Sequence, residues 1–509
     1  MRSGGNEFML NKYVWDNYLK AGGTEIVKMF RDSFNGEYTK EYGAQIRYLA
    51  SKYCPLDEIL DDLKARLLEL CDFVISDDFA KEKELLRKKH TSENDIVSRV
   101  LTDDYAEISD IIEQELQTEA SPQRVFDYFI RDIAGDSTIF AMVFPDLFVP
   151  YYFQYNFNVL EIIAEQFDID LPRIPLKKDY EERYYYYGEV CKALNIFRVD
   201  NALSPYELWA FLYDFAPNYI GGLDSYLIKE LPEPRGAFFI GGSEDDIGLS
   251  DNPLALWQCN EETRVGDMIV MYFKTPVSAI DSVWRACSVG FIDPFFYYYR
   301  CTYIGNRKKI NHVTQKMMKD DPIISALPIV RKNMQGINGV ELLPSEYNHL
   351  MDMAGVELFR FQYEEESISE NISREKDVED KLIKPLLLKL GYEEKDYTQQ
   401  LYIEIGNHNH ALIPDFVLLP NRSAGHSSAF AIIEAKKTIP NDKVLEETKT
   451  QARSYANQLK TRYSVVASKE KIWVTSEKDD YSKDIFIAAW AELYDPDVFY
   501  QLEKMIGFH

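Results

Sequence analysis

In the stretch Pro414-Asp415-Phe416-Val417-Leu418-Leu419, the acidic residue Asp415 precedes an apolar run. A second apolar stretch, Ile432-Ile433-Glu434-Ala435-Lys436, follows it along the chain. Both runs have the length and composition of β-strands, and proline is tolerated at the first position of a strand. Because side chains alternate along a strand, Glu434 and Lys436 project to the same face. A sheet that brings Asp415 beside Glu434 would therefore gather two carboxylates and one ammonium group around one point.

This set of side chains suits phosphodiester hydrolysis. Two carboxylates can hold a hard divalent cation, Mg²⁺ or Mn²⁺, which keeps several waters and binds phosphate oxygens. A lysine within reach can orient or deprotonate a water and offset charge in the transition state. We therefore expect a metal-dependent hydrolytic site at Asp415, Glu434 and Lys436.

Two neighbouring segments fit the same site. Glu379 lies at the edge of an apolar helical stripe that continues through Leu382 and Ile383, and it could serve as an extra metal ligand. Gln451 and Tyr455 are four residues apart in a predicted helix, Leu445–Leu459, so they share one helix face. Nine basic residues stand against four acidic ones between positions 436 and 471, which predicts a phosphate-binding surface.

These motifs together resemble a PD-(D/E)XK nuclease, most similar to the N-terminal nuclease domain of type I restriction enzyme R subunits. The motifs that carry the resemblance, between about Ser373 and Thr475, are Glu379 in EDKLIKPLLLKLGY, Pro414-Asp415, Glu434-Ala435-Lys436 and Gln451-x-x-x-Tyr455, the QxxxY element of RecB-like nucleases. The resemblance implies an α/β nuclease domain over residues 374–509. It also implies Mg²⁺ bound by Asp415, Glu434 and Glu379, Lys436 acting on the attacking water, and Gln451 and Tyr455 orienting the DNA or the site. A nuclease-like fold that has lost its activity is the alternative.

The middle of the chain, residues 231–360, has short apolar runs separated by Gly, Pro and Asp, which predicts a small β-barrel. The expected strands include Ala237–Ile240, Met268–Phe273, Val283–Phe291 and Phe296–Ile304, and Ser345 is expected to cap a short helix.

A weaker resemblance, to EVE/PUA-like domains, covers this region. It rests on Trp257, Val265-Gly266-Asp267, Asp293-Pro294 and Leu343-Pro344-Ser345-Glu346-Tyr347. Domains of that family hold a flipped, often modified, base in an aromatic pocket. The candidate pocket residues are Trp257, Tyr272, Trp284, Phe295 and Phe296, and the alternative for each is a place in the hydrophobic core.

Residues 9–230 show mainly helical periodicity, for example in Asp57–Leu70 and after Ser204-Pro205-Tyr206-Glu207, which has the features of a helix start. The run Tyr184–Tyr187 predicts either core packing or a surface that stacks on nucleotides. Thr102–Ala120 carries seven acidic residues, no basic one and an apolar stripe (Ile108, Ile111, Ile112 and Leu116). That segment is either a solvated helix face, or a surface that docks a partner or mimics DNA. No family resemblance identifies the region.

The chain has 509 residues and a net charge of −27, so we expect a multidomain α+β protein that does not coat nucleic acid through bulk charge. Residues 1–8 resemble a leftover from cloning, and residues 361–373 read as a linker. No secretory signal is visible, and the apolar run Ile139–Phe153 is interrupted by Pro145, Asp146 and Pro150, which predicts a cytoplasmic protein without a membrane span. The six cysteines lack metal-site spacing and are expected to be free thiols.

The leading functional hypothesis is a Mg²⁺-dependent DNA endonuclease that performs modification-dependent restriction in defence against phage. One alternative is an effector nuclease licensed by a protein partner or a nucleotide signal, and another is a non-catalytic nucleic-acid adaptor. RNA remains open as a substrate, and cutting of both strands from one site per chain would suggest a homodimer. No P-loop motif occurs, so the chain is expected to carry no ATP motor.

Overall fold

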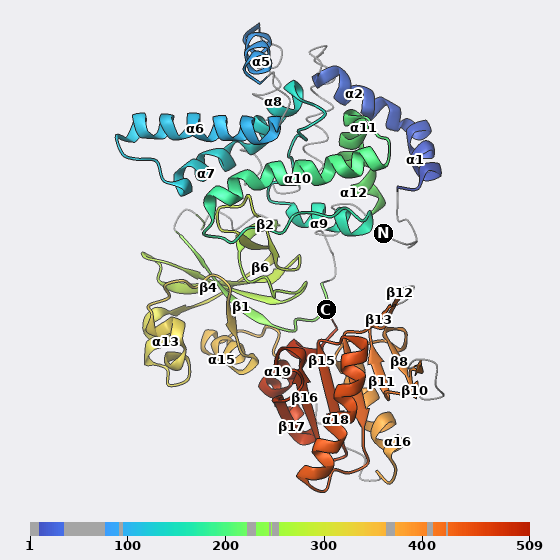
Figure 1. Ribbon diagram of the computed structural model, residues 1–509. Helices are drawn as coiled ribbons and strands as arrows, with labels where there is room; N and C mark the ends of the chain where they lie inside the picture. The colour runs from blue at the N-terminus through green and yellow to red at the C-terminus, as the bar shows by residue number, and fades with distance from the viewer. Residues whose placement is uncertain are drawn as a thin grey trace.

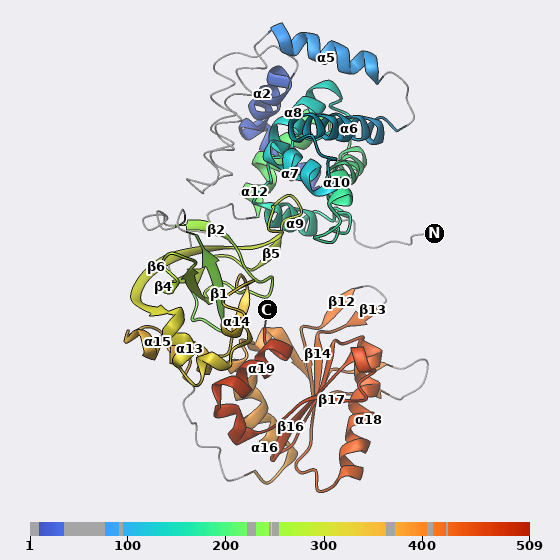
Figure 2. The ribbon, with the colours of Figure 1, turned by 90° about the vertical axis from the view of Figure 1, so that its left-hand side faces the viewer.

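The computed structural model describes residues 10–34, 77–90, 95–220, 231–243, 246, 254–362, 372–404, 411–423 and 426–508. Three parts are stacked along one direction: a group of helices, a seven-stranded sheet, and a six-stranded sheet with helices on both faces (Figure 1, Figure 2). The expected mixed α+β class is confirmed, and one of the two large sheets forms a half-barrel. The predicted helical segment at 57–70 and most of the predicted linker lie outside the described residues.

The first part is helical. Its elements are α1 (Lys12–Tyr18), α2 (Thr24–Phe34), α5 (Asp77–Lys89), α6 (Ile96–Leu116), α7 (Pro122–Arg131), α8 (Ile133–Val143), α9 (Phe157–Gln166), α10 (Tyr180–Asp200), α11 (Pro205–Ala210) and α12 (Ala216–Tyr219), with π turns at Leu19–Gly23 and Phe211–Phe215. The predicted helix start is confirmed: Ser204 and Glu207 form a reciprocal capping box ahead of α11. Among the described helices, none is long and apolar enough to cross a membrane.

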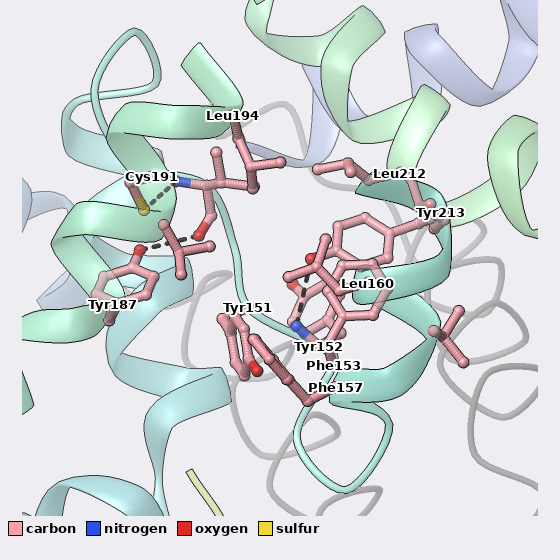
Figure 3. Packing of buried hydrophobic residues seen from close by; sticks show 14 of the residues in the cluster. Tyr151, Tyr152, Phe153, Phe157, Leu160, Tyr187, Cys191, Leu194, Leu212 and Tyr213 are labelled. Atoms are coloured by element: carbon pink, nitrogen blue, oxygen red, sulfur yellow. Dashed lines mark hydrogen bonds between the residues drawn. The ribbon is translucent and has the colours of Figure 1, made fainter. Parts of the chain in front are cut away.

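The tyrosine run is part of the core of this helical group. Tyr184, Tyr186 and Tyr187 are buried, and the Tyr187 hydroxyl donates to the carbonyl oxygen of Val149 at 2.9 Å (Figure 3). Cys191, one turn along α10, accepts a hydrogen bond from the Val149 amide at 3.4 Å. Core packing, rather than nucleotide stacking, therefore accounts for three of the four tyrosines.

The acidic helix α6 differs from its predicted form. It ends at Leu116, and of the predicted apolar stripe Ile112 is buried, whereas Ile111 and Leu116 are 42% and 51% exposed. Helices α7 and α10 pack against α6, but Ile111 and Leu116 stay largely exposed. The rest of the helix presents an acidic face with two exposed apolar side chains.

The middle sheet has the strand order β2-β6-β4-β3-β1-β7, with β5 paired to β6. Its elements are β1 (Ala237–Gly242), β2 (Leu254–Gln258), β3 (Met268–Phe273), β4 (Ala279–Ala286), β5 (Phe291–Ile292), β6 (Arg300–Thr314) and β7 (Val340–Leu342), with α13 (Gln315–Asp320), α14 (Pro328–Arg331), α15 (Pro344–Ala354) and a short turn of helix at Ile324–Ala326.

Two strand boundaries and one helix cap in this part differ from the sequence prediction. The run Val283–Phe291 is split between β4 and β5, and β6 begins at Arg300 instead of Phe296 because the Asp293 carboxylate accepts from the amide of Phe295 and forms a turn there. Ser345 does not cap α15: the helix begins at Pro344, and the Ser345 hydroxyl donates to Asp497 at 2.6 Å.

The last sheet has the order β17-β16-β15-β14-β11-β8, in which only the β14–β15 pair is parallel. Its elements are β8 (Tyr397–Gln399), β11 (Phe416–Leu418), β14 (Ala431–Ala435), β15 (Tyr463–Ala467), β16 (Lys471–Ser476) and β17 (Asp484–Ala489), beside the small pairs β9 (Ile403–Glu404) with β10 (Ala411–Leu412) and β12 (Asn421–Ser423) with β13 (His426–Ser428). The helices are α16 (Glu375–Val378), a π turn (Glu379–Ile383), α17 (Lys384–Lys389), α18 (Asp442–Leu459) and α19 (Pro496–Ile506), with short turns at Glu394–Asp396, Glu477–Asp479 and Trp490–Tyr494.

Helices cover both faces of this sheet (Figure 2). On one face α18 packs on Val417 and Ile432, and on the other α17 and α19 pack on Phe416 and Ile433. The neighbours in each strand therefore point to opposite faces, as the alternation predicts. The apolar run Lys471–Thr475 predicts the last strand of the sheet, and this prediction is wrong, since β17 and α19 follow it.

Polar contacts join the three parts. Arg183 of α10 is fully buried and donates to the carbonyl oxygens of Pro294 at 2.9 Å and Phe296 at 2.8 Å. At the other junction Glu503 of α19 lies 3.5 Å from Arg235 and 3.8 Å from Arg264. The stack is thus held together by buried charged side chains in addition to apolar contacts.

Candidate active site

The two strands that carry the predicted acids are antiparallel neighbours in the last sheet. Phe416 pairs with Ile433, so Asp415, one residue before, lies next to Glu434, one residue after. The backbone amide of Ala435 donates to Asp415 Oδ2 at 2.7 Å. This hydrogen bond fixes the Asp415 carboxylate against β14.

Glu434 is the most buried of the site carboxylates, with 2% exposure. Its Oε1 accepts a hydrogen bond from Lys436 at 2.9 Å, and its Oε2 has no hydrogen-bond partner among the described residues. Burial, and next the charge of Asp415, raise the pKa of Glu434 to about 7. Burial also raises the pKa of Asp415, although the Ala435 amide opposes the shift.

Lys436 is held by carboxylates on two elements. Its Nζ donates to Glu434 Oε1 and to the Ala435 carbonyl oxygen at 3.0 Å, and it lies 3.8 Å from Glu375 of α16. Burial lowers the pKa of Lys436, but the hydrogen bond that Lys436 donates to Glu434 and the surrounding negative charges outweigh it, so the net shift is upward. The ammonium group is therefore charged and directed into the acidic cluster.

Glu379 lies in the π turn between α16 and α17, close enough to Asp415 for mutual repulsion. Burial first, and then the charge of Asp415, raise the pKa of Glu379. Single π turns inside helices are frequent at functional sites, and this one directly precedes α17, which has Pro385 in its first turn.

The donor set of the site decides whether a divalent cation fits it. Within the described part of the chain, no three His, Cys, Asp or Glu side chains are arranged as a metal site, so nothing here supports Glu379 as a third ligand. Mg²⁺ usually takes only one or two protein carboxylates and completes its shell with water and phosphate oxygens. The unpartnered Glu434 Oε2 beside Asp415 fits that requirement.

The structure brings Gln451 and Tyr455 together on α18. Gln451 Nε2 donates to the Tyr455 hydroxyl at 2.9 Å. Tyr455 packs with Ile432, and Glu434 projects to the same sheet face because it lies two residues further along β14. The pair therefore shares a face of the sheet with the acidic residues.

The predicted basic surface is smaller than the sequence count suggests. Five of its nine members are paired with acids: Lys436–Glu434, Lys443–Glu447, Lys449–Asp484, Arg453–Asp480 and Lys469–Glu470. Asp480 and Asp484 lie outside residues 436–471, the segment in which basic residues outnumber acidic ones. The members without a carboxylate partner among the described residues are Lys437, Lys460, Arg462 and Lys471.

The five candidate base-pocket residues do not line a common cavity. Phe295 and Phe296 pack into the core of the helical part, where the rings of Phe295 and Tyr151 are 4.7 Å apart. Tyr272 lies in a core on one face of the middle sheet, and Trp284, with Trp257 packed beside it, lies in a core on the other. The predicted aromatic pocket is therefore corrected: the strand pleat separates its members, and Arg183 holds the turn after Asp293 against the helices.

One site residue was missed in the sequence. Glu375 lies 3.8 Å from Lys436, and its charge acts on Asp415 and Glu434. Its position four residues before Glu379, one helical turn away, is a signal that could have identified it.

Comparisons with known proteins find little. No family model matches the chain, and no curated protein matches it. The NMR structure of Rpa0253 from Rhodopseudomonas palustris is similar over 24% of this chain and 96% of its own, at 13% sequence identity and a TM-score of 0.21. A likeness of that size carries no argument about fold or function.

Proposed function

We propose that the chain is a Mg²⁺-dependent nuclease of the PD-(D/E)XK type that hydrolyses phosphodiester bonds in DNA. The observation that supports this most is the Glu434 carboxylate, which is buried beside Asp415 with one oxygen unpartnered among the described residues. A buried carboxylate costs free energy unless a cation or hydrogen bonds compensate it. A bound divalent cation would supply that compensation.

In this proposal Asp415 and Glu434 hold the cation. When bound, Mg²⁺ would polarise the phosphate and lower the pKa of a water. The Lys436 ammonium group orients the water and offsets negative charge at the phosphate. Gln451 and Tyr455, which are hydrogen-bonded to one another, orient the DNA strand on the same sheet face.

A cleavage assay tests the nuclease. Supercoiled and linear DNA, and a matched RNA, are incubated with and without Mg²⁺, using the full chain and the variants Asp415→Asn, Glu434→Gln and Lys436→Met. Lys437→Met is the matched control, since Lys437 is adjacent and exposed. We expect the full chain and Lys437→Met to cut DNA in the presence of Mg²⁺, and the three site variants not to cut it. The proposal is refuted if the full chain cuts neither DNA nor RNA, or if the site variants cut normally.

Selection of modified DNA, and with it a restriction role, is a separate part of the proposal because it depends on the middle sheet. Its test compares matched DNAs with and without modified cytosines. Preferential cutting of the modified DNA supports it, and equal cutting of both removes it while leaving the nuclease intact.

A second candidate is a nuclease licensed by a protein partner or a nucleotide signal. The exposed acidic face of α6, with Ile111 and Leu116 uncovered, favours it because such a face can bind a partner. Cutting that appears only after a partner or nucleotide is added would support this candidate. A chain whose biological effect survives Glu434→Gln would instead be a non-catalytic adaptor.

A further inference from the structure

A pocket of about 350 Å³ lies on the middle sheet where β4 adjoins β6, away from every residue assigned to the nuclease site. Figure 1 shows these strands next to one another in the central part of the molecule. The residues that line it are Met268, Val283, Trp284, Arg285, Asn306, Arg307, Lys308, Leu358 and Phe359. The volume is at the lower end of the range for small-molecule sites, roughly 300–1,000 Å³.

The lining carries three cations and no carboxylate, in a chain with a net charge of −27. Arg285 donates to the carbonyl oxygen of Gly266 at 2.6 Å and to that of Pro232, and no acid among the described residues forms an ion pair with it. Lys308 is exposed and has no carboxylate partner among the described residues. Such a rim attracts an anion.

Arg307 is the buried cation of the pocket. Its side chain is 6% exposed and pairs with Asp281 at 2.6 Å through Nη2, whereas Nε and Nη1 have no hydrogen-bond partner among the described residues. The guanidinium carbon lies 5.5 Å from the centre of the Trp284 ring. A single carboxylate leaves this buried group only partly satisfied, and a bound anion would offset part of that cost.

Apart from Asn306, the remaining lining is apolar, and Leu358 and Phe359 pack against the core cluster that contains Met268 and Val283. An aromatic ring can stack on a nucleobase, and a basic rim can bind its phosphate. The combination distinguishes this pocket from a site for inorganic anions, which needs no apolar wall.

We infer that this pocket binds one nucleotide unit, with the base against Phe359 and the phosphate at Lys308 and Arg307. The unit is either a free 5′-mononucleotide or a nucleotide of a single DNA strand, because both present the same chemistry. The inference goes beyond the proposed nuclease and depends on none of its carboxylates.

Calorimetric titration of the full chain with the four 5′-mononucleotides, the corresponding nucleosides and a short single-stranded DNA tests this inference. Lys308→Glu reverses a charge in the lining, and Lys309→Glu is the matched control on the neighbouring, opposite-facing position of β6. We expect Lys308→Glu to weaken binding by roughly tenfold or more, because a charged hydrogen bond to phosphate is lost, and Lys309→Glu to bind like the parent. Phe359→Ala should weaken the nucleotide and the oligonucleotide together.

Binding of a mononucleotide identifies a free ligand, and binding of the oligonucleotide alone identifies a DNA strand; either supports the pocket if Lys308→Glu selectively weakens it. The inference is overturned if nothing binds at millimolar concentration, if nucleosides bind as tightly as nucleotides, or if both charge reversals weaken binding equally. Glu434→Gln separates the two proposals, since it should abolish cutting and leave this binding unchanged.

Discussion

The Asp415 carboxylate accepts a hydrogen bond from the backbone amide of Ala435 at 2.7 Å, so the acid of one strand is anchored to the strand that bears Glu434. This hydrogen bond to the backbone holds the Asp415 carboxylate beside the Glu434 carboxylate. Burial raises the pKa of both acids, and the charge of Asp415 raises the pKa of Glu434 further. The site therefore holds negative charge at a cost that binding of a cation relieves.

Asp415→Asn should separate this structural contact from the charge. Asparagine keeps an oxygen that accepts from the Ala435 amide, so the free energy of unfolding should stay within about 1 kcal/mol of the parent. Mg²⁺-dependent cleavage should fall by roughly 100-fold or more, because a metal ligand is lost. Urea unfolding and cleavage rates check both, with the exposed Glu447→Gln as control; a variant that keeps full cleavage contradicts the assignment of Asp415.

Glu434 predicts an unusual dependence of stability on pH. Its pKa is raised from 4.5 to about 7, so between those values the folded protein binds more protons than the unfolded chain. The free energy of unfolding should therefore fall as pH rises through this window, by at most about 3 kcal/mol from this group. Glu434→Gln should make the slope shallower by this group's share, measured by urea unfolding between pH 4.5 and pH 8.

Mg²⁺ provides the control for this experiment. At pH 8 the ion should restore stability to the parent but not to Glu434→Gln. Glu503 also has its pKa raised to about 7, by burial at the junction with the middle sheet, so Glu503→Gln should flatten the slope as well while retaining the response to Mg²⁺. Equal Mg²⁺ responses in the two variants would argue against a cation at Glu434.

Glu375 is expected to position Lys436. Its carboxylate lies 3.8 Å from the ammonium group, and its charge helps to raise the pKa of Lys436. Glu375→Gln should shift the part of the pH–rate profile that depends on Lys436 to lower pH by a few tenths of a unit, since the contact is partly exposed. Lys436→Met should abolish cleavage at every pH. If Glu375→Gln leaves the pH–rate profile of cleavage unchanged, Glu375 does not position Lys436.

The parts of the structure that the sequence predicts are those set by local pattern. The bounds of β3 follow from the apolar run Met268–Phe273, and the capping box before α11 follows from Ser204 and Glu207. The proximity of Asp415 and Glu434 needed one further assumption, that their strands are neighbours, which the register confirms.

The failed predictions depend on contacts between distant segments. Phe295 and Phe296 lie in a turn that Arg183, more than a hundred residues earlier, holds in the helical core. The basic surplus near α18 was overestimated because Asp480 and Asp484 pair with it from outside residues 436–471. The periodicity of a single segment does not show which distant residues will contact it. The positions of these side chains are therefore set by tertiary contacts and not by local pattern.

Arg183 should be essential to the junction of the helical part with the middle sheet. It is fully buried, and besides the carbonyl oxygens of Pro294 and Phe296 its guanidinium carbon lies 4.2 Å from the centre of the Phe126 ring. Arg183→Met should lower the free energy of unfolding by about 3–5 kcal/mol, because buried carbonyl groups lose their donors and the ring contact is lost. Thermal unfolding against the more exposed Arg131→Met checks this; similar effects of the two variants would contradict it.

Tyr455 allows the packing of α18 to be separated from its contribution to the site. Its ring is buried against the sheet and its hydroxyl accepts from Gln451. Tyr455→Phe should cost no more than about 1 kcal/mol of stability, because one partly exposed hydrogen bond is lost, whereas Tyr455→Ala should cost about 3 kcal/mol through the cavity it leaves. If the pair orients DNA, Tyr455→Phe and Gln451→Ala should each reduce cleavage, and the double variant should be no slower than the slower single one, because both remove the same hydrogen bond. Additive losses in the double variant would show that the two side chains act separately.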